Sequence, residues 1–317
     1  MKKLLLFTIL VISIICIAEN MTFIVGKDEG SIESIQEAID RASDGDTIYI
    51  KPGVYQENIV IKNKEVKIIG ESPDVRLKVE GSEASPVVYI EDSEIELANL
   101  TIFASGTVAV MAMNSTVVFR DMNLILGDAV GVFLIATGTV ATENQNVACF
   151  KNVNMTGVKT EKRVGGSRRI EVHDNRGIIS LMDYQLYVFN SQFSYLQVGI
   201  TTSSRKTLIS DSEFLYDVNA LVLVSGNNLV LSNKFHKAIE RAIVLMGNCR
   251  VELTNNSFAD NAVDLFLLNE SCDCCPSAKK FTGSIEGKFN IFKHTFIVQP
   301  EDTVLPCLLY TSPSPRD

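Results

Sequence analysis

The chain has 317 residues, with 29 basic and 38 acidic side chains and a formal net charge of −9. A surface of this sign repels phosphate, so a nucleic acid held by neutralisation of its backbone is excluded as a partner. The length allows one large all-β domain as readily as two smaller domains.

The first 18 residues are typical of a secretory signal peptide. Lys2 and Lys3 precede an apolar run over residues 4–17, and Cys16–Ala18 provides a small-x-small cleavage site. The run is too short, and too close to the terminus, for a retained transmembrane helix. We therefore expect residues 1–18 to be removed and the mature chain to be secreted, periplasmic or bound to the cell surface.

The last 11 residues, 307–317, resemble the translation of a transposon-end sequencing adapter. We expect them to be a sequencing artefact, and we expect the natural protein to continue past Pro306 with other residues. Residues 19–306 then form one domain that is truncated at its C-terminal end. They contain 26 basic and 37 acidic residues, a net charge of −11. They hold no further long apolar span, so no transmembrane segment is expected in them.

Residues 30–42 predict an amphipathic helix, because their apolar side chains recur at the spacing of one helix face. That face consists of Ile32, Ile35, Ala38, Ile39 and Ala42. The β-type run 47–50 follows a Ser-Asp-Gly-Asp turn and is typical of a strand.

A short motif recurs downstream at a spacing near 22 residues: an Asn or Asp follows an apolar run, and a bulky apolar residue comes three positions later. Its first positions are Asn99, Asp121, Asn152, Asn190, Asp211 and Asn255, with Ser232 in the remaining copy. Three short β-type runs per period, with no helical stretch between them, predict a coil of parallel strands. The alternative, a β-sandwich, needs hairpin signals between strands, and these are sparse.

The Asn and Asp residues suit the sharp turns of such a coil, because they tolerate left-handed backbone. Coils stack about 4.8 Å apart, so these side chains are expected to form a structural ladder. The amphipathic helix is expected to cover the open N-terminal end, which otherwise exposes strand edges and core.

Four segments near the N-terminus resemble the opening of pectin-lyase-like β-helix proteins. They are residues 34–40 (SIQEAID), 44–50 (DGDTIYI), 52–57 (PGVYQE) and 66–71 (VKIIGE). Secreted pectinesterases and β-helix surface proteins of bacteria and archaea begin in this way. The resemblance implies an all-β fold, a single-stranded right-handed parallel β-helix with the helix as its N-terminal cap. This fold hosts lyases, esterases, hydrolases and non-catalytic proteins, so the resemblance does not decide the function.

In enzymes of this family the active site usually lies on the outer face of the first strand of each coil. We expect these strands at residues 108–111, 132–135, 178–181, 200–203, 221–224, 243–246 and 263–266. Alternation places Val132, Leu134, Leu221, Leu223, Ile243 and Leu245 inside. The outward residues are then Ala109, Met111, Phe133, Ile135, Ile179, Leu181, Thr201, Ser203, Val222, Val224, Val244, Met246, Asp264 and Phe266. This outer stripe is largely apolar.

The stripe does not suit the chemistry of pectin-active enzymes. A polysaccharide lyase needs clustered carboxylates that bind calcium together with a basic residue, and a pectinesterase needs paired acids, glutamines and an arginine. Only Asp264 is acidic here. No cofactor is expected, and calcium enters only if the protein is lyase-like.

An irregular segment, residues 156–176, lengthens one repeat and is expected to cover the apolar stripe. It holds the only dense charged cluster that includes a histidine: Lys159, Lys162, Arg163, Arg168, Arg169, Glu171, His173 and Asp174. One interpretation is a site for an acidic glycan, with Arg168 and Arg169 binding carboxylates. The other is a solvated surface loop. Weak catalytic candidates are Arg168, Arg169, His173, Asp174 and Asp264. His236 and His294 are expected to be surface residues.

Five cysteines remain after both ends are removed: Cys149, Cys249, Cys272, Cys274 and Cys275. The turn that holds Cys249 lies one coil before the turn with the other three, so a disulfide between Cys249 and Cys272 is expected in an exported chain. The competing interpretation is a metal site made by Cys249, Cys272, Cys274 and Cys275, a set that zinc accepts. Cys149 is expected to be a buried thiol.

Three classes of function remain open. The first is a non-catalytic exported β-helix that binds a polysaccharide or a cell-surface protein. The second is a carbohydrate-active enzyme, a polysaccharide lyase or carbohydrate esterase with its site built from loops. The third is a structural envelope or adhesin repeat. The apolar stripe, the lack of the acids and basic residues that a lyase or pectinesterase needs there, and the acidic net charge favour the first.

Overall fold

The computed structural model describes residues 20–79, 85–137, 146–164, 167–181, 183–268, 279–293 and 297–298. Between residues 162 and 169, and at 297–298, only the backbone is described. The expected signal peptide, the segment 307–317 and His294 fall outside these residues. So do Cys272, Cys274 and Cys275, and with them the expected disulfide and the four-thiolate metal site.

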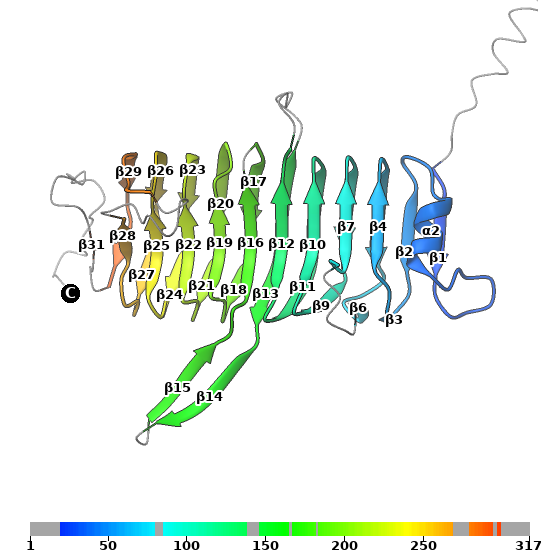
Figure 1. Ribbon diagram of the computed structural model, residues 1–317, viewed down its shortest axis with the longest axis horizontal. Coiled ribbons are helices and arrows are strands. Elements are labelled where there is room, and N and C mark those ends of the chain that lie inside the picture. The colour runs from blue at the N-terminus through cyan, green and yellow to red at the C-terminus, as the bar shows by residue number, and fades with distance from the viewer. Residues whose placement is uncertain are drawn as a thin grey trace, which may run out of the picture.

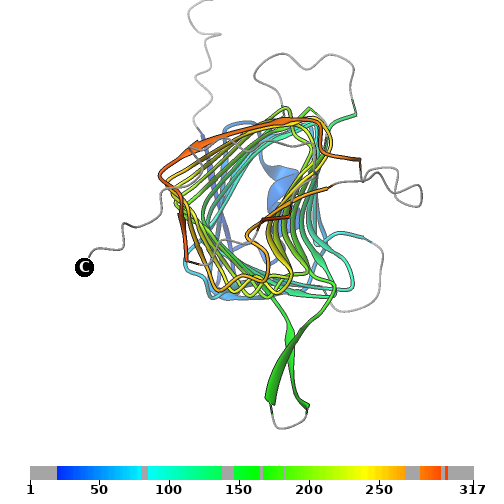
Figure 2. The ribbon, with the colours of Figure 1, turned by 90° about the vertical axis from the view of Figure 1, so that its left-hand side faces the viewer.

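Parallel strands stack in successive coils along one axis (Figure 1), and the coils superimpose when seen along that axis (Figure 2). Each coil supplies strands to three faces that surround a common core. The coil of parallel strands expected from the repeat is therefore confirmed, and the β-sandwich alternative is wrong.

The first face is a sheet of ten parallel strands. In stacking order they are β4 (Ile59–Lys62), β7 (Val88–Glu91), β10 (Val108–Met113), β12 (Val130–Ile135), β16 (Arg176–Leu181), β19 (Val198–Thr202), β22 (Asn219–Leu223), β25 (Arg241–Leu245), β28 (Leu265–Leu267) and β31 (Ile297–Val298). The inward side chains expected here, Val132, Leu134, Leu221, Leu223, Ile243 and Leu245, are all buried.

The second face begins with β1 (Thr22–Val25) and β2 (Thr47–Ile50). It continues with β5 (Glu65–Gly70), β8 (Glu94–Ala98), β11 (Thr116–Gly127), β13 (Val147–Gly157), β17 (Gln185–Phe189), β20 (Lys206–Ser210), β23 (Gly226–Leu231), β26 (Cys249–Thr254) and β29 (Ser284–Lys288). The long strands β11 and β13 also run on into the third face.

The third face is made of short strands. They are β3 (Gly53–Tyr55), β6 (Val75–Lys78), β9 (Thr101–Ser105), the second halves of β11 and β13, β18 (Gln192–Ser194), β21 (Glu213–Leu215), β24 (Lys234–His236), β27 (Ser257–Ala259) and β30 (Ile291–Phe292). The bulky apolar residue of each repeat points inward from this face, and Phe193, Phe214, Phe235, Phe258 and Phe292 stack with centroid spacings between 4.6 and 5.1 Å.

The corner between the second and third faces is formed by the repeating Asn and Asp residues. Asn99, Asp121, Asn152, Asn190, Asp211 and Asn255 all have φ between 47° and 57°, and Ser232 has the same conformation. The next residue in each turn points inward and forms a second, buried ladder. There the backbone N–H of Ser212, Asn233 and Asn256 donates to the side-chain oxygen of the following coil at 2.9–3.0 Å.

The N-terminal helix is shorter than expected. Helix α2 spans Ile35–Arg41, with Ser34 as its N-cap, and buries Ile35, Ala38 and Ile39. The expected first turn is absent, because the backbone of Ile32 bridges to Val25 of β1 instead. The helix lies at the N-terminal end of the stack, beside β1 and β2 (Figure 1).

The segment 156–176 is not the irregular cover that the sequence suggested. Strand β13 extends to Gly157, and the chain then forms an antiparallel hairpin of β14 (Lys159–Val164) and β15 (Ser167–Val172). The hairpin projects away from the stack and does not lie over the first face (Figures 1 and 2). The apolar stripe is therefore not covered by this segment.

Candidate functional site

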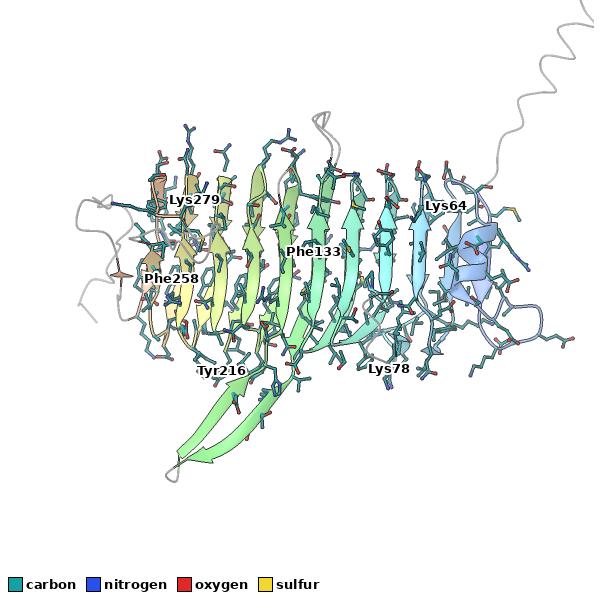
Figure 3. The ribbon with its side chains drawn as sticks, in the orientation of Figure 1. Lys64, Lys78, Phe133, Tyr216, Phe258 and Lys279 are labelled. Carbon is teal, nitrogen blue, oxygen red and sulfur yellow. The ribbon has the colours of Figure 1, made fainter. Side chains whose placement is uncertain are left out.

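One column of side chains runs up the outside of the first face. Backbone register aligns Val60, Tyr89, Met111, Phe133, Ile179, Thr201, Val222, Val244 and Phe266. Figure 3 shows Phe133 near the middle of this face. In the neighbouring column of the described strands, the carboxylate of Glu91 is paired with Lys62 at 2.7 Å. This column is therefore largely apolar, and within the described strands no acids converge on it. The column on its other side contains Arg176, Asn219 and Arg241, and the two arginines are paired with Asp174 and Glu240.

Two residues expected on that outer face lie inward instead: Ala109 is 0% and Asp264 2% exposed. Val244 lies in the outward column, although it is only 6% exposed. Ala109 and Asp264 are inward because each coil has two consecutive inward residues at or just before the start of this face, as in Ala109 and Val110. The small residue is needed because the next coil approaches closely: a Cβ at Gly131 would lie 2.6 Å from the carbonyl oxygen of Gly177. A strict alternation of inward and outward residues along the sequence does not predict two consecutive inward residues.

Asp264 is consequently not a catalytic acid on the open face. Its carboxylate accepts a hydrogen bond from Asn261 Nδ2 at 2.9 Å inside the corner. Its position adjoins β28, four strands along the first face from β16, where the hairpin ends. At the usual strand spacing this is about 19 Å, so the structure does not bring Asp264 together with the other candidates.

The hairpin holds the remaining candidates. Residues 159–172 contain five basic and two acidic side chains. The backbone register places Arg163 opposite Arg168 and Lys162 opposite Arg169. Basic residues therefore face basic residues across both of these pairs.

His173 and Asp174 lie where the hairpin returns to the stack. His173 Nε2 is 2.8 Å from the hydroxyl of Thr160, and its Nδ1 is 3.4 Å from Asp128. Asp174 is paired with Arg176 Nε at 3.3 Å. His173 therefore links the base of the hairpin to Asp128, whereas Asp174 is paired with the first residue of β16, on the first face.

Beside the hairpin base lies an aromatic stack that sequence reasoning missed. Tyr195 and Tyr216 pack face to face with centroids 5.3 Å apart and planes 6° apart. Lys159 Nζ lies 4.0 Å from the Tyr195 centroid, and Lys237 Nζ lies 4.9 Å from the Tyr216 centroid. Figure 3 places Tyr216 at this corner. The signal in the sequence was the repeated Phe-x-Tyr at 193–195 and 214–216.

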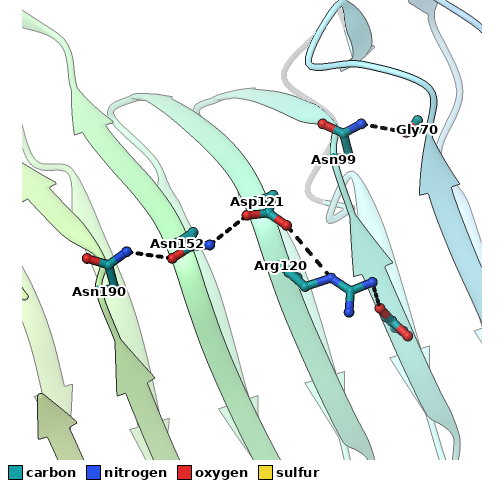
Figure 4. Close-up of polar contacts among 7 residues, drawn as sticks. Gly70, Asn99, Arg120, Asp121, Asn152 and Asn190 are labelled. Atoms are coloured by element: carbon teal, nitrogen blue, oxygen red, sulfur yellow. Dashed lines mark hydrogen bonds and ion pairs between the residues drawn. The ribbon is translucent and has the colours of Figure 1, made fainter. Parts of the chain in front are cut away.

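The outer corner ladder is continuous over part of its length (Figure 4). Asn152 Nδ2 donates to Asp121 Oδ1, and Asn190 Nδ2 donates to Asn152 Oδ1, both at 2.7 Å. Arg120 joins the run by pairing with Glu96 and Asp121. The side chain of Asn99 instead donates to the carbonyl oxygen of Gly70 at 2.8 Å. These bonds hold neighbouring coils together and present no exposed reactive group.

At another corner, side-chain oxygens also accept from the backbone of the preceding coil, and one of these side chains is a buried acid, Asp217. Asn261 Oδ1 accepts from the N–H of Ala238, and Asp217 Oδ1 accepts from Leu196 in the same way, both at 2.9 Å. The Nδ2 of Asn261 also donates to the carbonyl oxygen of Phe235, whereas Asp217 Oδ2 is buried without a partner. Burial raises the pKa of Asp217 well above its ordinary value, although the bond from Leu196 opposes the shift. Burial therefore favours the protonated form of this carboxyl.

Two cysteines are described, and both are thiols. Cys249 is the first residue of β26 rather than part of a turn, and its side chain is 0% exposed in the core. Burial raises its pKa to about 12. Cys149 is half-buried on the outside of the second face, and burial also raises its pKa.

Metal ligands do not gather in the described residues, where no group of three His, Cys, Asp or Glu side chains could hold an ion. In the same part of the chain, no helix has the length and apolar character needed to cross a membrane.

No protein-family model matches the chain, and no curated protein matches it. Among solved structures, it is similar to Escherichia coli YbhC, with 15% identity, TM-score 0.48, and coverage of 87% of this chain and 86% of that one. An alginate lyase from Paenibacillus sp. str. FPU-7 gives 11% identity, TM-score 0.43, and coverage of 86% and 99%. Pectin methylesterase PemA from Erwinia chrysanthemi gives 12% identity, TM-score 0.37, and coverage of 89% and 93%. Likenesses this distant say nothing of activity.

The architecture of the chain itself decides the fold. Three faces of parallel strands wind around one core, and they follow the N-terminal opening quoted above. The chain is a pectin-lyase-like parallel β-helix. In this β-helix, the hairpin and the adjoining corner are the places where charge and aromatic side chains gather outside the repeat.

Proposed function

We propose that this β-helix is an exported protein that binds an acidic polysaccharide through its basic hairpin and does not cleave it. The observation that carries the proposal is the backbone register of β14 and β15, which sets Arg163 opposite Arg168 and Lys162 opposite Arg169. Like charges directly opposite one another in an antiparallel pair destabilise the pair. A polyanion bound along the hairpin would remove that repulsion.

The charge distribution supports the same proposal. The hairpin, residues 159–172, carries a net charge of +3 within a region, residues 19–306, whose total is −11. Arginine is suited to carboxylate and sulfate groups, because its planar guanidinium donates two parallel hydrogen bonds. The acidic surface elsewhere would repel a polyanion, which favours binding at this projection.

A purely binding role is supported by the outer first face. Hydrolysis, elimination or de-esterification each needs polar groups that converge on the scissile bond. In the described strands that column is formed by apolar side chains together with Tyr89 and Thr201. The charged groups beside it are paired: Glu91 with Lys62, Asp174 with Arg176 and Glu240 with Arg241. The expected weak candidate His173 is hydrogen-bonded to Thr160.

The test is a binding measurement on the secreted chain with polygalacturonate and alginate, and with dextran as a neutral polymer. We expect binding to both polyuronates, none to dextran, and a steep loss of affinity as salt rises. The double variant Arg163→Gln/Arg168→Gln should bind at least 10-fold more weakly. The matched control Lys67→Gln/Arg250→Gln removes two exposed basic residues of the second face and should bind like the wild type.

Cleavage is assayed on the same polymers by reducing ends, unsaturated uronates and released methanol. We expect none of these products. Turnover by the wild type would overturn the non-catalytic part of the proposal, and undiminished binding by the hairpin variant would overturn the hairpin as the site.

A further inference from the structure

The corner beside the hairpin holds two tyrosines in an unfavourable backbone conformation. Tyr195 has a φ of 57° and Tyr216 a φ of 60°. A bulky side chain with positive φ is an outlier, because its Cβ comes too close to the backbone. In the next two coils the same corner is occupied by Lys237 and Asp260, also with positive φ. Strain of this kind tends to be kept at ligand-binding sites.

The two rings are the centre of a four-layer stack. Lys159 lies over the outer face of Tyr195, and Lys237 lies over the outer face of Tyr216 and donates to its hydroxyl at 2.9 Å. Lys159 is the first residue of β14, so the stack begins at the base of the hairpin. From Lys159 to Lys237 it runs along the β-helix axis over about three strand spacings, or about 14 Å.

The two lysines have only loose contacts with carboxylates. Lys159 Nζ is 3.8 Å from the carboxylate of Glu161, farther than a hydrogen bond. Lys237 is exposed, and within the described residues it forms no ion pair. Both ammonium groups therefore have aromatic rings as their main partners. An ammonium group held in this way keeps its charge available to an anion in solvent.

We propose that the Lys159–Tyr195–Tyr216–Lys237 stack is the second, rigid part of the polysaccharide site. A linear glycan with repeated carboxylate or sulfate groups lies along this corner, parallel to the β-helix axis. Its anionic groups bind Lys159 and Lys237, and its sugar rings contact the tyrosine edges and hydroxyl groups between them. This inference rests on the proposed function, and it adds the direction in which the polymer runs.

The stack is rigid, and this rigidity suits it to bind a polymer in one orientation. The tyrosines are amphipathic and lose little conformational freedom on binding, and both are partly exposed. Their rings are already stacked in register, so the two lysines are held at fixed separation. The projecting hairpin adds charge, whereas the stack fixes the orientation of the bound chain.

The experiment compares Lys159→Gln/Lys237→Gln with a matched control in the full chain. The control, Lys206→Gln/Lys288→Gln, removes two lysines that lie over other rings, Tyr187 at 5.7 Å and Phe289 at 5.9 Å. Binding to polygalacturonate should fall at least 10-fold in the first variant and less than 2-fold in the control. Thermal unfolding of both variants shows whether they are folded.

Two further measurements define the ligand. The chain has no Trp and eight Tyr, so its fluorescence comes from tyrosine, and the variant without Tyr195 and Tyr216 identifies the part that the stack contributes. Polygalacturonate should change it in the wild type and not in Tyr195→Leu/Tyr216→Leu. Poly-glutamate, an acidic polymer without sugar rings, should bind at least 10-fold more weakly than polygalacturonate.

The outcomes separate this inference from the proposed function. If Lys159→Gln/Lys237→Gln binds like the wild type while the Arg163/Arg168 variant does not, the hairpin is the site and the stack is not part of it. If poly-glutamate binds equally well, the site recognises an acidic peptide or charge alone, and the proposal that a glycan lies along the stack is wrong. If the wild type binds no polyuronate, both the proposed function and the proposed binding of a glycan along the stack are overturned.

Discussion

The side-chain amide of Gln36 pairs with the backbone of Val60 as a neighbouring strand would. Gln36 Nε2 donates to the carbonyl oxygen of Val60 at 3.0 Å, and its Oε1 accepts from the Val60 N–H at 2.7 Å. Val60 belongs to β4, the first strand of the first face, whose outer edge has no strand beside it. One helical side chain thus satisfies part of an open sheet edge, which is otherwise a site of aggregation.

Loss of this contact should weaken the N-terminal end of the stack. We expect Gln36→Ala to lower the free energy of unfolding by about 1–2 kcal/mol, and to increase hydrogen exchange at Val60. Gln56→Ala, which removes an exposed glutamine nearby, serves as the control and should have little effect. An unchanged exchange rate at Val60 in Gln36→Ala would show that the amide does not protect the edge.

Glu57 anchors the same helix from the other side. Its carboxylate accepts from the hydroxyl of Ser34 at 2.7 Å and from the backbone N–H of Ile35 and Gln36 at 2.8 and 3.1 Å. We expect Glu57→Ala to cost about 1–3 kcal/mol, because the first N–H groups of α2 lose their acceptor. Circular dichroism has little helix to report on, so denaturant unfolding is the measurement. Glu33→Ala, an exposed acid just before the helix, is the control.

Asp217→Asn should stabilise the protein increasingly as pH rises. In the unfolded chain Asp217 loses its proton near pH 4, whereas burial raises its pKa in the fold, although the hydrogen bond from Leu196 opposes the shift. The folded state therefore binds one more proton between the two pKa values, and wild-type stability falls with rising pH by about 1.4 kcal/mol per unit in that window. Asn carries no such proton and can donate as Asn261 does, so the variant lacks this slope.

The comparison is made by urea unfolding from pH 4 to pH 8. Asp46→Asn is a matched control at another buried acid, where both oxygens accept from backbone N–H groups of Met21 and Ser43. It should destabilise the protein, since the amide nitrogen that replaces one carboxylate oxygen cannot accept a hydrogen bond from a backbone N–H. Equal stability of wild type and Asp217→Asn at pH 8 would mean that Asp217 is ionised in the fold.

The two ladders at the second-to-third corner should differ in their contribution to stability. Asn256 is fully buried: its Oδ1 accepts from the Asn233 N–H at 2.9 Å, and its Nδ2 donates to the carbonyl oxygen of Val230 at 2.8 Å. Asn256→Ala leaves both groups unpaired in the core and should cost about 2–4 kcal/mol. Asn152→Gly removes two solvent-exposed ladder bonds, to Asp121 and from Asn190, while keeping the left-handed turn, and should cost less than Asn256→Ala because water can replace both bonds. Similar losses in thermal unfolding would contradict this ranking.

The two described thiols should differ in reactivity. Cys249 is buried with a pKa of about 12, and a raised thiol pKa leaves little thiolate at neutral pH. We expect a maleimide at pH 7 to label Cys149 slowly and Cys249 only after unfolding, as read by peptide mass spectrometry. Labelling of Cys249 in denaturant without a reductant distinguishes a thiol there from the disulfide to Cys272 that the sequence suggests. Rapid labelling in the folded chain would contradict its burial.

The coil was predictable because its determinants are local and repeated. Each Asn or Asp that tolerates positive φ marks one corner, and each bulky residue three positions later joins the core, as in Asn190 and Phe193. The same periodicity, recurring every coil, restricts neighbouring strands to one register. The apolar character of the outer first face followed from simple alternation as well.

The hairpin was misread although a signal for it was present. Gly165 and Gly166 separate two polar β-type runs, and a Gly-Gly pair is typical of a two-residue hairpin loop. The segment was expected to cover the apolar face because it lies next to it in the chain. Its own strands pair with each other instead, which satisfies their backbone groups without the stack.

Sequence periodicity therefore established the strands, their corners and the core, since each depends on residues close together in the chain. Tertiary structure alone decided that Asp264 is buried, that Asp217 has an unpaired oxygen, and that Tyr195 and Tyr216 stack between two lysines. These features depend on side chains about one coil apart, or more, whose meeting is set by the stacking of whole coils. The physical reason is that a turn conformation is encoded locally, whereas burial and contact between coils arise only when the coils are packed together.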